Sequence, residues 1–102
     1  SVMPDGDSLS LWQGILGAWT LETFGRGRTT ETLVHLAEEV RELRDSDLAG
    51  TGYEEEAADC LILLLCYAHR RGFSLHDALR RKHQVNRARV WKDDGHGIMR
   101  HV

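Results

Sequence analysis

The feature that most constrains this chain is an unbroken apolar run, residues 61–68, that directly follows a cluster of acidic residues. The acidic residues are Glu54, Glu55, Glu56 and Asp59. A helix that is apolar on nearly every side is buried on most of its faces. In a chain of 102 residues, such burial requires a helical bundle or a second subunit. The single proline, Pro4, lies near the start, which favours long helices.

Apolar spacing and capping residues predict four helices in one domain that spans residues 1–102. The first runs from about Leu9 to Phe24 with Ser8 as N-cap, and the second from Thr29 or Thr30 to about residue 47. The third covers about 53–71 and stops at Gly72. The fourth follows a capping box at Ser74 and reaches about Trp91, before a polar tail. We therefore expect an all-α bundle of about four helices, with its core completed by homo-oligomerisation.

Cysteine usage and hydropathy indicate a cytoplasmic protein. Cys60 and Cys66 lie in the apolar stretch, where free thiols in a reducing compartment are a better interpretation than a disulfide. The apolar run is too short to span a bilayer, and no secretory signal is seen. The cysteines and histidines show no tight zinc-ligand spacing. We expect no membrane contact.

Two pairs of carboxylates lie where a helix would bury them. Glu39 and Glu42 are three residues apart on one shoulder of the apolar stripe of the second helix, and Glu56 and Asp59 lead into the buried face of the third. Buried carboxylates are rare unless they are paired or bind a cation. Four hard oxygen donors suit Mg²⁺ or Mn²⁺, so these four residues are the predicted metal ligands.

The alternative for every acid is a surface or first-turn role. We favour it for Glu54 and Glu55, because acids at a helix N-terminus suit the helix dipole. Glu38 could be a further ligand, the base that orients the attacking water, or a solvent-facing residue. The predicted catalytic set is therefore Glu38, Glu39, Glu42, Glu56 and Asp59. His35, one turn before Glu39, is expected to orient that carboxylate.

Basic and aromatic residues supply candidate ligand contacts. Lys82, Asn86 and Arg89, spaced by four and three residues, would share one face of the fourth helix and could bind a polyphosphate. The alternative is a solvated basic face. Trp12 and Trp19 share one stripe of the first helix, which is usually core but could form the wall of a base pocket. The full set of candidate base-binding residues is Trp12, Gln13, Trp19, Phe24 and Trp91.

These residues resemble a known family. Glu39-Val-Arg-Glu42 followed by Glu56-Ala-Ala-Asp59 is similar to the ExxE…ExxD signature of the MazG-like, all-α nucleoside triphosphate pyrophosphohydrolases. The K-x-x-x-N-x-x-R-x-W run from Lys82 to Trp91 and the Thr23-Phe24-Gly25 segment resemble the phage dATP/dGTP pyrophosphohydrolase branch, of the MazZ kind.

The resemblance implies cleavage of purine deoxynucleoside triphosphates, dGTP and dATP, to the monophosphate and pyrophosphate. It also implies two or more Mg²⁺ ions per site, with Mn²⁺ able to substitute, and a homodimer or homotetramer with shared active sites. One alternative is a general or pyrimidine-directed house-cleaning dNTP pyrophosphatase. Another is a non-enzymatic dimerisation module whose basic fourth helix contacts nucleic acid, but this leaves the buried acids unexplained. We therefore expect no nucleic-acid partner.

Overall fold

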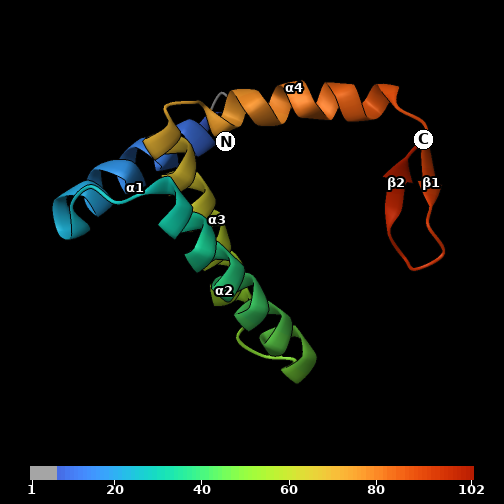
Figure 1. Cartoon of the computed structure of the whole chain (residues 1–102), viewed down its shortest axis with the longest axis horizontal. Helices are drawn as coiled ribbons and strands as arrows, with labels where there is room; N and C mark the ends of the chain where they lie inside the picture. Colours follow the sequence, from blue (N-terminus) through green and yellow to red (C-terminus); the bar gives the residue numbers. More distant parts are fainter. Residues whose placement is uncertain (1–6) are drawn as a thin grey trace, which may run out of the picture.

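The computed structural model describes residues 7–102, which form four helices followed by a β-hairpin (Figure 1). The helices are α1 (Ser8–Phe24), α2 (Thr29–Ala49), α3 (Tyr53–Arg71) and α4 (Leu75–Ala88). The prediction of a helical bundle with four helices is confirmed. Pro4 lies outside the described residues.

Glycines and one hydroxyl define several helix ends. Gly50 and Gly72 follow α2 and α3 with φ angles of 79°, in the left-handed region that glycine adopts without strain. The Gly72 N–H donates to the Ala68 carbonyl at 2.9 Å, so the predicted stop is confirmed. Ser74 Oγ accepts the Asp77 N–H at 3.1 Å, as the capping box predicts. The predicted Ser8 cap was wrong, because Ser8 is already helical and Asp7 precedes it.

Helices α2 and α3 form an antiparallel pair, and α1 packs against α3 (Figure 1). The crossing of α1 and α3 depends on Gly17, which is buried. A Cβ at this position would lie 2.3 Å from Cγ of His69, so the imidazole ring occupies the space that a side chain would need. The close approach of the two helices therefore requires glycine here.

Helix α4 contacts α1 near its own first turn and then leads away from the other helices (Figure 1). Gln13 of α1 holds the α3–α4 turn with both ends of its amide. Its Nε2 donates to the Phe73 carbonyl at 2.7 Å, and its Oε1 accepts the Leu75 N–H at 3.1 Å. Most of α4 consequently has no partner within the described part of the chain.

The predicted extension of the fourth helix to Trp91 was wrong. The helix ends at Ala88, Arg89 is extended, and Trp91 begins strand β1 (Trp91–Asp93), which pairs antiparallel with β2 (Met99–His101). The indole Nε1 of Trp91 donates to the Asn86 carbonyl at 2.8 Å, which ties the hairpin to the last turn of α4. The polar tail therefore contains a β-hairpin, an element that helical periodicity did not predict.

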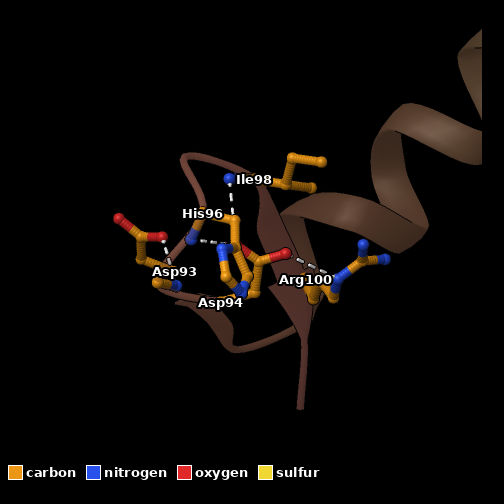
Figure 2. A network of polar contacts seen from close by, with 6 residues as sticks. Asp93, Asp94, His96, Ile98 and Arg100 are labelled. Carbon is orange, nitrogen blue, oxygen red and sulfur yellow. Dashed lines mark hydrogen bonds and ion pairs between the residues drawn. The ribbon is translucent and has the colours of Figure 1, made fainter.

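Asp94 holds the hairpin turn together (Figure 2). Its Oδ1 accepts the N–H groups of His96 at 2.7 Å and Ile98 at 3.2 Å, and its Oδ2 accepts Nε of Arg100 at 3.0 Å. The backbone N–H of His96, then those of Ile98 and the Arg100 side chain, lower the pKa of Asp94. One carboxylate thus satisfies three donors and holds the turn between β1 and β2.

The apolar core of a single chain is small. Only Leu65, Cys66 and Ala68 are buried apolar residues within residues 7–102, although 41% of the sequence is hydrophobic. The radius of gyration is 16.0 Å, whereas a compact domain of this length has a value of about 13 Å. Much apolar surface is therefore left uncovered by the chain itself.

No helix in residues 7–102 combines the length and the hydropathy needed to cross a membrane.

Candidate active site

An acidic cluster lies between α2 and α3. It is formed by Glu39 of α2 and by Glu56 and Asp59 of α3, whose carboxylate oxygens lie within 4.8 Å of one another. The spacing of three residues places Glu56 and Asp59 on the same face of α3. Because α2 and α3 are antiparallel neighbours, that face is turned towards Glu39. The structure thus brings together three of the four predicted ligands.

Two oxygens of this cluster have no hydrogen-bond partner. Oε2 of Glu39 and Oε2 of Glu56 are inaccessible to solvent and receive no donor from residues 7–102. A hydrogen bond to Glu42, followed by burial and the charges of Glu42 and Asp59, raises the pKa of Glu39. Burial first, then the charge of Glu42, raises the pKa of Glu56. Glu42 is exposed and outside the group of three, but it is near enough to influence the pKa values of both Glu39 and Glu56.

This arrangement fits a divalent cation. Orphaned, inward-facing carboxylate oxygens are costly in a protein that offers them no positive charge. Mg²⁺ and Mn²⁺ prefer hard oxygen ligands of this kind, and a bound cation would relieve the repulsion that raises the two pKa values. The residues present therefore match the predicted metal.

His35 contacts the acidic cluster, whereas the neighbouring acids lie outside it. Nε2 of His35 is 3.2 Å from Oε1 of Glu39, one helical turn away, so the imidazole is placed to orient that carboxylate as predicted. Glu38 is exposed and lies outside the cluster. Glu54 and Glu55 are exposed in the first turn of α3, where acids suit the helix dipole.

A cavity of about 500 Å³ adjoins the acidic cluster. Glu39 and Asp59 lie at one part of its wall, and Arg70 and Thr32 at another. Its wall is completed by Trp19, Thr20, Phe24, Gly27, Glu31, His35, Ile62, Leu63 and Cys66. A cavity of this size, with apolar walls and a few polar groups, is typical of a small-molecule site.

Two of the five candidate base-binding residues line this cavity. Trp19 and Phe24 pack edge to face, with ring centroids 5.5 Å apart. Trp12 is exposed on α1, Gln13 holds the α3–α4 turn, and Trp91 packs edge to face on His101 in the hairpin. In the single chain, those three lie away from the cavity.

The predicted phosphate-binding residues lie on α4 and just beyond it. Lys82 is exposed, and Asn86 is half-buried with an Oδ1 atom that has no hydrogen-bond partner in residues 7–102. Arg89 lies one residue past the helix in extended conformation, so the prediction that all three share one helical face was wrong. Because α4 leads away from α2 and α3, the chain by itself does not bring these residues to the acidic cluster (Figure 1).

Arg70 and Thr32, which also line the cavity, were not among the predicted site residues. Arg70 follows the apolar run at the C-terminal end of a helix, where a basic residue is ordinarily explained by the helix dipole. Thr32 is an unremarked position in the second turn of α2. Their contact joins residues that are 38 positions apart, which no local pattern signals.

The fold and the acidic cluster define a MazG-like pyrophosphohydrolase. The structure is similar to that of a cyanophage S-2L MazG-like pyrophosphohydrolase, which was solved bound to dGDP and three catalytic Mn²⁺ ions per active site. The TM-score is 0.81 at 35% sequence identity, and the match covers 92% of this chain and 96% of that one.

The sequence narrows this class further. Residues 12–102 match the family model for dATP/dGTP pyrophosphohydrolase. The chain is also 38% identical, over 90 residues, to the dATP/dGTP diphosphohydrolase of cyanophage S-2L, a match that covers 88% of this chain and 84% of that protein. The chain therefore belongs to the dATP/dGTP pyrophosphohydrolase family, and the predicted enzyme class is confirmed.

Proposed function

We propose that this protein hydrolyses dGTP and dATP to the corresponding monophosphate and pyrophosphate, with Mg²⁺ or Mn²⁺ bound between α2 and α3. The observation that carries the proposal is the convergence of Glu39, Glu56 and Asp59 beside a cavity of about 500 Å³. The cyanophage S-2L relatives, one named for dATP and dGTP and one solved with dGDP and Mn²⁺, support the substrate and the metal.

The proposed metal ligands are Glu39, Glu42, Glu56 and Asp59, which would hold two or more ions; the relative's structure has three per site. Bound cations of this kind lower the pKa of a coordinated water and offset charge that develops on phosphate oxygens. The four carboxylates would determine where the cations bind and therefore where the charge on the phosphate oxygens is neutralised. His35 holds Glu39 in place through its 3.2 Å contact. Glu38 is exposed and lies outside the cluster, which favours the solvent-facing alternative for this residue.

The cavity is the proposed site of the nucleoside. Trp19 and Phe24 offer an apolar, aromatic wall, against which a base can stack because every base has a π face. Trp12, Gln13 and Trp91 lie away from this wall in the single chain. A base-binding role for them would therefore require a second subunit.

We further propose that the active site is completed in a homo-oligomer, either a dimer or a tetramer. Lys82, Asn86 and Arg89 would then reach the triphosphate from α4 of a partner subunit. Two observations support this: α4 leads away from its own acidic cluster, and apolar side chains such as Trp12 and Leu79 are more than half exposed. A guanidinium, an ammonium and an amide are suitable donors to phosphate oxygens.

We also propose that the protein is cytoplasmic, because Cys60 and Cys66 are free thiols and a reducing compartment keeps cysteines in this form.

Product analysis tests the function directly. The purified protein is incubated with each of the four dNTPs, with Mg²⁺, with Mn²⁺ and with a chelator, and the nucleotides are resolved by ion-exchange chromatography. The expected result is metal-dependent formation of dGMP and dAMP together with pyrophosphate, without accumulation of diphosphates. Monophosphates formed mainly from dCTP or dTTP would indicate a pyrimidine-directed enzyme instead. No turnover, combined with salt-sensitive binding of DNA, would favour a nucleic-acid-binding module.

A further inference from the structure

We propose that Arg70 reads the purine base, by donating hydrogen bonds to N7 and O6 of guanine, and that it thereby favours dGTP over dATP. This inference rests on the proposed function, because it places the nucleotide in the cavity beside the acidic cluster.

Arg70 lines the same cavity as the acidic cluster, but at a distance from it. Asp59 and Arg70 both line the cavity from α3 and are eleven residues apart, which corresponds to about 16 Å along a helix. The wall between them is formed on α3 by Ile62, Leu63 and Cys66, which offer no donor for phosphate. A nucleotide whose phosphates lie at the metal end therefore points its base towards Arg70.

The guanidinium of Arg70 is held in place, but not all of its N–H donors have a partner. Its Nη1 donates to Oγ1 of Thr32, a residue with only 4% of its surface exposed. A Cβ at Gly27 would lie 3.1 Å from both terminal nitrogens, so this glycine leaves room for them. Arg70 forms no ion pair with a carboxylate in residues 7–102, and most of its five N–H donors remain for a ligand.

Guanine presents a pair of hydrogen-bond acceptors that adenine and the pyrimidines do not. The N7 and O6 acceptors of guanine match the fork of an arginine, and this pair is the commonest base-specific contact in the major groove of DNA. Adenine offers N7 beside an N6 amino donor, which would face the donors of Arg70, and pyrimidines have no N7. Such a bidentate pair discriminates against the wrong base by roughly 5- to 150-fold.

The test pairs a protein change with a substrate change. We would measure kcat/KM for dGTP, 7-deaza-dGTP and dATP with the wild type, Arg70→Met and Arg71→Met. The 7-deaza analogue removes only the N7 acceptor, and Arg71 is the exposed neighbour of Arg70 on α3 and serves as the matched control. Melting by circular dichroism establishes that each variant is folded.

The wild type should prefer dGTP to 7-deaza-dGTP, and Arg71→Met should keep that preference. Arg70→Met should lose roughly 5- to 150-fold on dGTP, lose less on dATP, and no longer distinguish dGTP from its 7-deaza analogue. Equal losses on all three substrates would overturn the proposal, because they would reduce Arg70 to a structural link with Thr32. If Arg70→Met does not fold, a wild type that hydrolyses 7-deaza-dGTP as well as dGTP overturns the N7 contact by itself.

A binding readout separates this proposal from the proposed function. Trp19 lines the cavity, so intrinsic tryptophan fluorescence can follow dGTP and dATP binding, with Ca²⁺ in place of Mg²⁺ so that the nucleotide is not hydrolysed during the measurement. Failure to form monophosphates would contradict the function alone. The base-reading role would still be supported by tighter binding of dGTP than dATP in the wild type and by loss of that difference in Arg70→Met. An unchanged preference in the variant would overturn it.

Discussion

Glu39 and Glu56 each direct one oxygen into the space between α2 and α3, where no donor of residues 7–102 meets it. Without a cation, these groups oppose folding, since ionised carboxylates repel one another and lose hydration. The proposed metal explains their positions, whereas the stability of the fold does not. Conflict between local stability and function is expected at active sites.

The cost of placing these two carboxylates together predicts how the stability of the metal-free protein depends on pH. The pKa values of Glu39 and Glu56 are raised above the ordinary value of 4.5, so the folded protein holds protons that the unfolded chain releases. The stability contribution of these two groups is therefore fully present below pH 4.5 and is lost as pH rises through their folded values. Melting temperatures measured in chelator should show less loss of stability on raising the pH in Glu39→Gln than in the wild type. An identical pH profile would contradict the raised pKa of Glu39.

Part of the acidic cluster could be predicted from the sequence, because the spacing of acids on two helices places them against apolar stripes. The structure brings Glu39, Glu56 and Asp59 together, and their role as metal ligands stays a prediction. The position of Arg70 could not be predicted, because it depends on a cavity between helices and not on its neighbours in the chain.

At the scale of elements, the packing of α1 on α3 depends on Gly17. We expect Gly17→Ala to destabilise the protein by about 1–3 kcal/mol, because the new methyl group overlaps the His69 ring. Gly14→Ala is the matched control on α1, since a Cβ there meets nothing within 4 Å, and it should stabilise by about 0.5–1 kcal/mol.

Urea unfolding followed by circular dichroism measures both changes. The double change Gly17→Ala with His69→Ala should recover much of the loss, because it removes the group that the methyl meets. Equal stability of the two single variants would contradict the account of this crossing.

The helices could be predicted from sequence more fully than the tail. The bounds of α3, Tyr53–Arg71, follow from an apolar run between two glycines. The end of α4 was misjudged because Arg89 is extended and Trp91 pairs with His101, a pairing across ten residues that helical periodicity does not register.

At the scale of the whole molecule, the single chain leaves much apolar surface uncovered. Its core has three buried apolar residues within residues 7–102, and helix α4 extends away from the other helices (Figure 1). The apolar α3 led to the prediction of a homo-oligomer, which stays a proposal, and the direction of α4 could not be predicted from the sequence.

If the protein is an oligomer, a charge introduced on the apolar side of α4 should weaken its assembly. Leu79 is 58% exposed, and Leu79→Glu should shift the protein towards monomers and lower turnover, since it places a charge where we expect an apolar contact. Gln84→Glu introduces a negative charge on the opposite side of the same helix and should change neither property. Light scattering coupled to size exclusion measures the mass. A wild type that is monomeric at the concentrations used for assay would contradict the proposal.

The most direct test of the central claim is Mn²⁺ binding and dGTP turnover measured on the same preparations of wild type, Glu56→Gln and Glu55→Gln. Both changes replace an acid with an amide in the first turn of α3, but only Glu56 faces the cluster. Glu56→Gln should weaken Mn²⁺ binding in calorimetry and reduce dGMP formation by at least a hundredfold, in the range of losses seen for a single catalytic group. Glu55→Gln should match the wild type in both. Unchanged Mn²⁺ affinity and turnover in Glu56→Gln would contradict a catalytic metal site between α2 and α3.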